Sequence, residues 1–420
     1  MNILILTLGS RGDVQPYVAL GAALRARGHC VTVAAGRGFE ATIEAQGLAA
    51  APLSDDVRAL LQTPEIQKAL RTLSGKVQAW RRSKGMFRRQ LDEMWDVARA
   101  LRPDVIVYHH PKGLAAQHIA EAQSAVAVPT ALIPAYVPTG AYPSPALPVP
   151  NLGRVGNAMS HKAVGRLISL LLSGKIDKWR HERLGLAGKA PRDLFDGYAP
   201  DGRAVPRLHA FSRHLVPPPE DWAGRERVTG YWFSDHAADW QPPEALVRFL
   251  DDGPPPVYVG FGSMPAKDAP RLTRIVIEAL RTANERGILA TGWGGLEAVD
   301  CSDRIHVLDA APHDWLFPRC SAVVHHGGAG TTHEGLRWGR PTVVCPVFGD
   351  QPFWGRRVMA VGAGPAPLPQ KHLSAAMLAS ALAAVRAPSV RKQADEIGAA
   401  MREEPGAAGA AAIIDSMAAA

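Results

Sequence analysis

A glycine-rich turn that opens a helix is the strongest chemical signal in this sequence. Gly327-Gly328-Ala329-Gly330-Thr331 follows the apolar run 322–325 and precedes a helical pattern. Such a turn presents backbone N–H groups and the positive helix end to an anion, and His326 can add a donor. We therefore expect a phosphate or diphosphate site here; the alternative is an ordinary turn in which the glycines serve only packing.

The turn differs from the two common phosphate-binding motifs. No lysine follows the glycines as the pattern GxxxxGK[ST] requires, and the spacing is not GxGxxG. A kinase or a dehydrogenase is therefore disfavoured.

Polar residues near the same turn can hold the rest of a sugar nucleotide. Glu334, one turn into the helix, can accept hydrogen bonds from ribose hydroxyls, or it can merely complement the helix dipole. Asp350 and Gln351 offer acceptors and donors side by side for vicinal sugar hydroxyls, although Asp350 can also cap a helix. Gly262 allows close approach to the backbone, and the Ser263 hydroxyl can bond a phosphate oxygen; a tight turn is the alternative for this pair.

Near the N-terminus, Asp13 is the candidate general base. It ends the turn Gly9-Ser10-Arg11-Gly12-Asp13, which follows an apolar run. A carboxylate in a cleft can remove the proton from an attacking hydroxyl, or it can simply cap the following helix. Burial would raise the pKa of Asp13, whereas Arg11 and the helix end would lower it, and the sequence does not decide between them.

Secondary candidates surround this base. Ser10, Arg11 and Gly12 lie in the same turn, and His109 and His110 end another expected strand that faces the cleft, where they can contact an acceptor.

Two series of strands and helices must position these residues. The first has expected strands at 2–7, from 31, and at 105–108, 130–133 and 208–211. The second follows a proline-rich stretch, with expected strands at 257–261, 287–291, 305–308, 322–325 and 342–345. Strand–helix–strand units of this length form parallel sheets. We predict an α/β fold of two doubly wound halves that face each other across a cleft, with chemistry on the loops after the strands.

Composition narrows the function further. The four cysteines are scattered and no apolar stretch reaches membrane-spanning length, so a reducing cytoplasm is expected. No cluster with metal-ligand spacing appears, and no DxD pair stands in a suitable place, so no metal is expected.

The net charge is +8, and residues 66–91 hold eight basic residues and no acidic one. That segment is either a solvated helical face or a surface for anionic lipid or an acidic acceptor; no nucleic-acid motif accompanies it.

Several longer motifs resemble one protein family over nearly the whole chain. The chain resembles the nucleotide-sugar-dependent glycosyltransferases of GT-B fold, in the branch of bacterial glycopeptide glycosyltransferases and sterol 3β-glucosyltransferases. The motifs that carry the resemblance are GSRGDVQPYVALG (9–21), PSPALP (143–148), VTGYWF (228–233), VYVGFGSM (257–264), APHDWLFPRCSAVVHHGGAGTTHEGL (311–336) and FGDQPFWG (348–355).

The resemblance implies roles for several of the candidate residues. Asp13 matches the catalytic base, His326 a diphosphate contact, Ser263 a phosphate contact, Glu334 the acid near the ribose, and Asp350 with Gln351 the pair near the sugar. His313 lies in the nucleobase-binding stretch. Ala310 aligns with the stacking tryptophan of plant relatives, so the base is held differently here, with Trp293 as a candidate substitute.

The resemblance also implies a domain plan. It comprises an acceptor-binding domain (1–215), a linker region (216–255), a donor-binding domain (256–400) and a C-terminal helix (401–420) that packs back on the first domain.

The implied reaction is inverting, metal-independent hexosyl transfer from a nucleotide sugar, with UDP-glucose as the first expectation and a dTDP-sugar as the second. A hydrophobic acceptor such as a sterol, terpenoid or polyketide is expected, with peripheral membrane contact through residues 66–91. The apolar segment 167–172 is expected either in a core helix or facing the acceptor. The alternatives are a glycopeptide-type acceptor, an inactive helper protein of this fold, or a sugar-nucleotide epimerase. Oligomeric state is left open.

Overall fold

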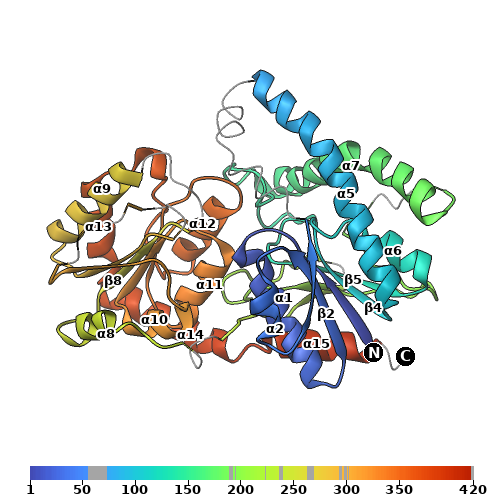
Figure 1. Cartoon of the computed structure of the whole chain (residues 1–420). Helices are drawn as coiled ribbons and strands as arrows, with labels where there is room; N and C mark the ends of the chain where they lie inside the picture. Colours follow the sequence, from blue (N-terminus) through green and yellow to red (C-terminus); the bar gives the residue numbers. More distant parts are fainter. Residues whose placement is uncertain are drawn as a thin grey trace.

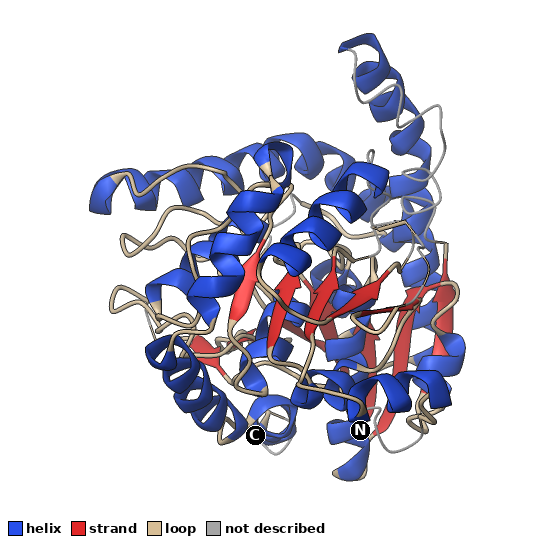
Figure 2. Ribbon diagram, turned by 90° about the vertical axis from the view of Figure 1, so that its left-hand side faces the viewer, coloured by secondary structure: helices blue, strands red, loops and turns tan. Residues whose placement is uncertain are grey.

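Two parallel α/β sheets, each flanked by helices, form the protein (Figures 1 and 2). The computed structural model describes residues 1–54, 73–188, 193, 195–222, 224–235, 240–262, 269–292, 296–297, 300 and 302–417, with only the backbone over 73–84. The prediction of two doubly wound, Rossmann-like halves is confirmed. Among the described residues, no helix is long and apolar enough to cross a membrane.

The N-terminal sheet has seven strands in the order β3-β2-β1-β4-β5-β6-β7. They are β1 (Asn2–Leu6), β2 (Cys30–Gly36), β3 (Ala49–Leu53), β4 (Val105–His109), β5 (Val126–Ala131), β6 (Arg207–His209) and β7 (Glu226–Val228). The helices of this half are α1 (Arg11–Ala26), α2 (Glu40–Glu44), α5 (Leu73–Leu101), α6 (Ala116–Gln123) and α7 (Gly153–Leu184). Strands β3 and β7 were not expected from the sequence, and β5 begins four residues before the expected strand.

The C-terminal sheet has five strands in the order β10-β9-β8-β11-β12. They are β8 (Val257–Gly260), β9 (Gly287–Ala290), β10 (Ile305–Leu308), β11 (Ala322–His325) and β12 (Thr342–Val344). Its helices are α8 (Glu244–Asp251), α9 (Ala269–Thr282), α10 (His313–Leu316), α11 (Ala329–Arg337), α12 (Gln351–Ala360), α13 (Ala375–Val385) and α14 (Pro388–Arg402), with 3-10 turns η2 (Phe317–Arg319) and η3 (Gln370–His372).

Each sheet reverses its strand order once, and these switch points decide where ligands can bind. The order reverses between β1 and β4 in the first sheet and between β8 and β11 in the second. Loops that leave neighbouring strands in opposite directions open a crevice between them. The register places Leu6 beside Tyr108 and Gly260 beside His325, so the turns after these four strands lie next to one another in pairs.

Contacts between the halves are partly polar and partly apolar. The Ser212 amide donates to Nε2 of His333 at 3.2 Å, while Nδ1 of His333 lies 2.7 Å from the Ala329 carbonyl oxygen. The His333 ring stacks on Tyr231 at 4.5 Å. Burial lowers the pKa of His333 to about 4, so its neutral imidazole can donate to Ala329 and accept from Ser212.

The chain ends on the half where it began. Helix α15 (Gly406–Ser416) packs against α1, below the N-terminal sheet in Figure 1. Ala410, Ala411 and Ile414 join the hydrophobic core of that sheet. Arg27 and Asp415 form an ion pair at 2.5 Å across the contact.

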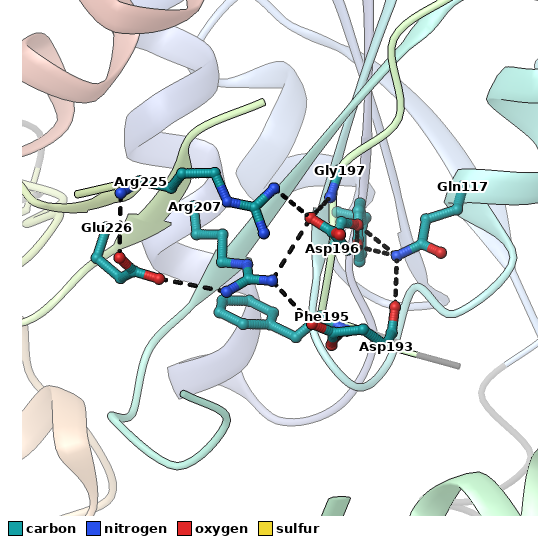
Figure 3. A network of polar contacts seen from close by, with 9 residues as sticks. Gln117, Asp193, Phe195, Asp196, Gly197, Arg207, Arg225 and Glu226 are labelled. Carbon is teal, nitrogen blue, oxygen red and sulfur yellow. Dashed lines mark hydrogen bonds and ion pairs between the residues drawn. The ribbon is translucent and has the colours of Figure 1, made fainter. Parts of the chain in front are cut away.

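A polar network fastens the edge of the N-terminal sheet (Figure 3). Arg207 of β6 forms ion pairs with Asp193 at 2.8 Å and with Glu226 at 3.2 Å. These pairs connect β6 to β7, which carries Glu226, and to Asp193, which precedes β6 in the chain. Asp196 accepts from Arg225 at 2.9 Å, and its carbonyl oxygen accepts from the Gln117 amide group. The network holds the segment that carries Phe195, a side chain that lies beside the candidate site.

Candidate active site

The turn after β1 holds Asp13 in a fixed orientation. Ser10 is the N-cap of α1, and both its backbone N–H (2.8 Å) and its hydroxyl (2.9 Å) donate to Oδ2 of Asp13. Oδ1 of Asp13 lies 2.6 Å from Nζ of Lys112, which follows β4. Asp13 is therefore both a capping residue of α1 and a half-buried carboxylate at the β1–β4 switch point, where it can meet a ligand.

Burial and nearby cations oppose each other at Asp13. Burial raises the pKa of this carboxyl, but the charge of Lys112 and the hydrogen bonds from Lys112 and Ser10 lower it by more, so the pKa of Asp13 lies below its ordinary value. Asp13 is thus an ionised carboxylate at neutral pH, ready to accept a proton. The cation responsible is Lys112, which the sequence did not single out.

His109 and His110 lie on different sides of the β4 end. Nδ1 of His109 is 3.2 Å from the Thr7 hydroxyl, which donates to the Asp13 carbonyl oxygen. Burial and the Lys112 charge lower the pKa of His109 to about 3, so the ring stays neutral. His110 instead contacts the rings of Tyr136 (4.3 Å) and Phe195 (5.1 Å). These three rings form an aromatic wall beside the base, since Tyr136 lies within the field of Asp13.

Asp350, in the other half, lies within electrostatic reach of Asp13. The negative charge of Asp13 adds to burial in raising the pKa of Asp350, and Lys112 opposes the rise. The carboxylate starts α12 and accepts from Nε1 of Trp354 at 2.7 Å. Tyr136 and Tyr231 both lie within the field of these two carboxylates. The structure thus brings the expected base and an expected sugar contact to one place.

The glycine-rich turn after β11 packs tightly around His326. A Cβ atom at Gly262 would lie 2.7 Å from the His326 ring, and a Cβ at Gly328 would lie 2.7 Å from its Nε2 atom. Gly262 also has a φ of 78°, which disfavours other residues. Burial lowers the pKa of His326 to about 4. Nδ1 of this neutral ring is buried and has no hydrogen-bond partner among the described residues.

The first amides of α11 provide the remaining donors. Helix hydrogen bonding begins with the Thr332 amide, which donates to the Gly328 carbonyl oxygen at 3.0 Å, and the Thr332 hydroxyl bonds the same atom. The N–H groups of Ala329, Gly330 and Thr331 precede that bond, so they have no intrahelical partner. The Gly327 amide differs, because it donates to Nδ1 of His325 at 2.9 Å.

Glu334 is a buried carboxyl inside the same helix. Burial is the main cause that raises its pKa to about 7, while Arg337 and Trp338 act in the opposite direction. Oε1 accepts from Nε1 of Trp338 at 2.8 Å and lies 3.5 Å from Arg337. Both of these contacts are made by one of the two carboxyl oxygens, Oε1.

Two other expected contacts have structural partners. The side-chain oxygen Oε1 of Gln351 accepts from the backbone amides of Val347 (2.7 Å) and Phe348 (3.2 Å), which shapes the loop before Asp350. His313 stacks on Phe317 at 4.3 Å, and burial together with the Arg11 charge lowers its pKa to about 4. Arg11, an exposed residue of the N-terminal half, therefore acts electrostatically on the expected nucleobase stretch of the other half.

The remaining predicted residues fall into two groups: those among the described residues, and those outside them. A Cβ at Gly12 would meet only the Ser10 hydroxyl, at 3.9 Å, so this glycine borders open space. Ser263 and Trp293 lie outside the described residues, as does the first part of the basic segment 66–91. Within its described part, Arg88 pairs with Asp92 and Glu182.

Two family descriptions match separate parts of the chain. Residues 3–138 match the glycosyltransferase family 28 N-terminal domain. Residues 294–417 match the C-terminal domain of erythromycin biosynthesis protein CIII-like proteins.

Sterol glucosyltransferases are similar over nearly the whole chain. Sterol 3-beta-glucosyltransferases UGT80A2 and UGT80B1 of Arabidopsis thaliana are 36% and 35% identical over 98% of this chain. A sterol 3-beta-glucosyltransferase of Neosartorya fischeri is 36% identical over 97% of it. The chain spans 64% and 67% of the two plant proteins and 29% of the fungal one.

Solved structures share the fold at low sequence identity. The glycotransferase of kitacinnamycin superposes with a TM-score of 0.71 and 19% identity, covering 99% of this chain and 98% of that one. Glycosyltransferase VinC in complex with dTDP superposes with a TM-score of 0.64 and 19% identity, covering 99% of each chain.

Proposed function

The chain belongs to the nucleotide-sugar-dependent glycosyltransferases of GT-B fold, and we propose that it transfers a hexosyl group, with inversion, from a nucleotide sugar to a hydroxyl of a hydrophobic acceptor. One observation carries the proposal. An ionised carboxylate, Asp13, stands at the switch point of one sheet, within the electrostatic field of Asp350 from the half that also holds the glycine-rich turn after β11.

In the proposed reaction, Asp13 accepts the proton of the acceptor hydroxyl as the oxygen attacks the anomeric carbon. The carboxylate is already deprotonated, and the two Ser10 donors together with Lys112 fix its orientation. Each carboxylate oxygen has two lone-pair sites, so these bonds leave room for the incoming hydroxyl. Orienting both substrates across the cleft supplies much of the rate enhancement.

The leaving diphosphate requires donors instead of a base. The free amides at the start of α11 and the neutral His326 ring can donate to its oxygens, and the helix dipole favours the developing charge. The proposal therefore assigns stabilisation of the leaving group to His326, Gly328, Gly330 and Thr331. It is metal-independent, because these groups replace the charge that a cation would supply.

The proposed substrates follow from the relatives and the site. UDP-glucose is the proposed donor, with a dTDP-sugar as the second choice, and Glu334 and Asp350 with Gln351 are assigned to the ribose and the sugar. A sterol, or a terpenoid or polyketide of similar shape, is the proposed acceptor, because the similar proteins are named sterol 3-beta-glucosyltransferases. The aromatic wall of His110, Tyr136 and Phe195 beside Asp13 supports a flat apolar acceptor. We place the reaction in the cytoplasm, with peripheral contact at the inner face of the membrane.

Mass spectrometry of products tests the proposal directly. The purified protein is incubated in EDTA with UDP- and dTDP-sugars and with a panel of sterols, terpenoids, polyketides and a glycopeptide scaffold. We expect a hexose increment on a hydrophobic alcohol that Asp13→Asn abolishes, with a rate loss of about 10²-fold or more. Asp251→Asn, an exposed residue at the end of α8, is the matched control and should leave the yield unchanged.

Each other outcome changes a different part of the proposal. Full activity of Asp13→Asn would remove Asp13 from the role of base. A product formed only on the glycopeptide scaffold would replace the hydrophobic acceptor. Binding of nucleotide sugar without transfer or hydrolysis, by the wild-type protein and with every acceptor, would indicate a helper protein.

A further inference from the structure

Helix α7 carries an uncovered apolar stripe. Of the eleven large hydrophobic side chains that are exposed among the described residues, six lie between 152 and 171. They include Leu170, exposed to 83%, and Val155, exposed to 73%; the others are Leu152, Met159, Leu167 and Leu171. Soluble proteins scatter such residues singly, so a concentration on one helix indicates a binding surface.

The spacing places these side chains along one side of the helix. Val155 and Met159 are four residues apart, exposed Ala163 and Leu167 continue at the same interval, and Leu170 and Leu171 follow at three and four. The opposite side packs inward: Ile176 is buried against Leu114, and the partly buried Ile168 and Leu172 pack with them. Residues 167–172 thus have both an inward and an outward apolar face.

The charged side chains of the stripe's own stretch of helix are all basic, although Asp221 from another segment lies near Arg154. From Ala122 to Ile176 the sequence contains no acidic residue, while Arg154, Lys162 and Arg166 are exposed on the same helix. Helix α5, which continues the basic sequence 66–91, lies beside α7 and projects beyond the body of the protein (Figure 1). An apolar stripe flanked by Lys and Arg is typical of helices that lie in the interface of an anionic bilayer.

We propose that the outer face of α7 docks the protein on an anionic lipid bilayer, with the stripe inserted among the lipids and the basic side chains on the headgroups. A second copy of the chain suits the face poorly, because a two-fold contact would set these cations against one another. An anionic lipid surface instead complements both the apolar and the charged components.

The inner side of the same helix is bonded to the loop 134–150. His161 contacts the carbonyl oxygens of Ala135 and Tyr142, each at 3.1 Å, and the Ser160 hydroxyl accepts from the Ser144 amide at 2.8 Å. This loop carries Tyr136 of the aromatic wall. Docking through α7 would therefore place the bilayer behind the wall beside Asp13, a suitable position for an acceptor that arrives from the lipid. This last step alone rests on the proposed function.

Vesicle binding tests the docking surface without any activity assay. The protein is sedimented with vesicles of phosphatidylcholine alone, or of phosphatidylcholine mixed with phosphatidylserine. We expect binding to the mixed vesicles, weakened roughly tenfold or more in the triple variant Leu167→Ser/Leu170→Ser/Leu171→Ser. The matched control Met359→Ser/Met377→Ser changes two exposed side chains elsewhere and should bind normally.

A second variant distinguishes loss of membrane binding from misfolding of the triple variant. Lys162→Glu/Arg166→Glu keeps the apolar stripe and reverses two charges, so it should also lose binding to the anionic vesicles while keeping the wild-type circular dichroism and melting temperature. Wild-type affinity in both variants, or no binding of the wild-type protein to either vesicle, would overturn the proposal. So would a wild-type dimer in solution that the triple variant converts to monomer, since a second copy would then cover the stripe.

Discussion

Nζ of Lys112 lies 2.6 Å from Oδ1 of Asp13, although 98 residues separate them in the chain. The two residues meet because β1 and β4 are neighbours and the turns after them share the switch point of the sheet. Gly9, with a φ of 121°, completes the arrangement, since a Cβ there would collide with both the amine and the carboxylate. The expected base is therefore half of an ion pair, with a cation that the sequence analysis did not name.

Replacing the lysine should make the base easier to protonate. In Lys112→Met the cation that lowers the pKa of Asp13 is gone, while the burial that raises it remains. The acid limb of the kcat/KM profile should therefore move to higher pH, with a several-fold larger loss of activity at pH 5.5 than at pH 8. Steady-state rates with the identified substrates, measured across this range, check the shift.

The conservative variant separates charge from geometry. Lys112→Arg keeps a cation beside Asp13, so its acid limb should stay close to that of the wild-type protein. If Lys112→Met lost activity equally at all pH values, Lys112 would serve only to hold the loop in place.

The sequence predicted the positions of the turns well where a single loop carries the candidate residues. The turns at Asp13, His326 and Asp350 were predicted because each follows a recognisable apolar strand, and the strand order places the turns after β11 and β12 side by side. Contacts between loops were not predictable in the same way. Lys112 was missed because its role depends on which strands are neighbours, and its position after His110 was the only available signal.

Short elements were missed for a local reason. Strand β3 reads AAAPL and β7 reads ERV, so neither has the β-branched or aromatic run that indicates a strand. They form because they pair with the edge of an existing sheet. For β7, the ion pair between Arg207 and Glu226 adds to this pairing. The outward stripe of α7 was missed for a related reason, because an apolar run does not tell which of its residues face the core.

A methyl group at Gly328 should displace His326. The φ of Gly328 is −63°, which alanine adopts without strain, so the only expected conflict is the Cβ contact of 2.7 Å with Nε2 of His326. Gly328→Ala should therefore raise the KM for the nucleotide sugar about tenfold while the melting temperature changes little. The matched control is Gly165→Ala in α7, where a Cβ would meet nothing within 4 Å.

A double-mutant cycle tests whether this effect passes through the histidine. His326→Ala should raise the same KM, and adding Gly328→Ala to it should change little, because the displaced ring is already absent. Additive losses would mean that Gly328 acts through its own approach to the ligand.

The Glu334 carboxyl should destabilise the folded protein increasingly as the pH rises. Its pKa rises from 4.5 to about 7 on folding, so the unfolded chain releases this proton first and stability is lost as pH rises from 4.5 through 7. Glu334→Gln should therefore be more stable at pH 8 by roughly 1 to 3 kcal/mol and no more stable at pH 4. Urea denaturation at the two pH values checks this, with exposed Glu244→Gln in α8 as the control.

The same variant should bind the donor less tightly. An amide offers one acceptor oxygen where the carboxylate offers two, so the Kd for UDP-glucose should rise about tenfold at pH 8. Calorimetric titration measures it. Unchanged affinity together with the gain in stability would show that the carboxyl does not contact the ribose.

His209 should make the fold sensitive to acid. The side chain is 1% exposed, stacks on Trp222 at 4.6 Å, and has no hydrogen-bond partner for either ring nitrogen among the described residues. Burial and the Arg207 charge lower its pKa from 6.5 to about 3. Below pH 6.5 His209 becomes protonated in the unfolded chain but stays neutral in the folded protein. The free energy of unfolding therefore falls as the pH falls, by about 2 kcal/mol at pH 5.

Phenylalanine at this position removes the proton uptake and keeps a ring among Phe195, Phe211 and Trp222. His209→Phe should therefore be more stable than the wild-type protein at pH 7, since two unpaired polar atoms are gone, and the difference should grow at pH 5. Denaturation curves at both pH values measure this, with exposed His181→Phe as the control. If the wild-type and His209→Phe stabilities fell in parallel between pH 7 and 5, acid sensitivity would arise from other buried histidines, such as His326 and His333, whose pKa values are about 4.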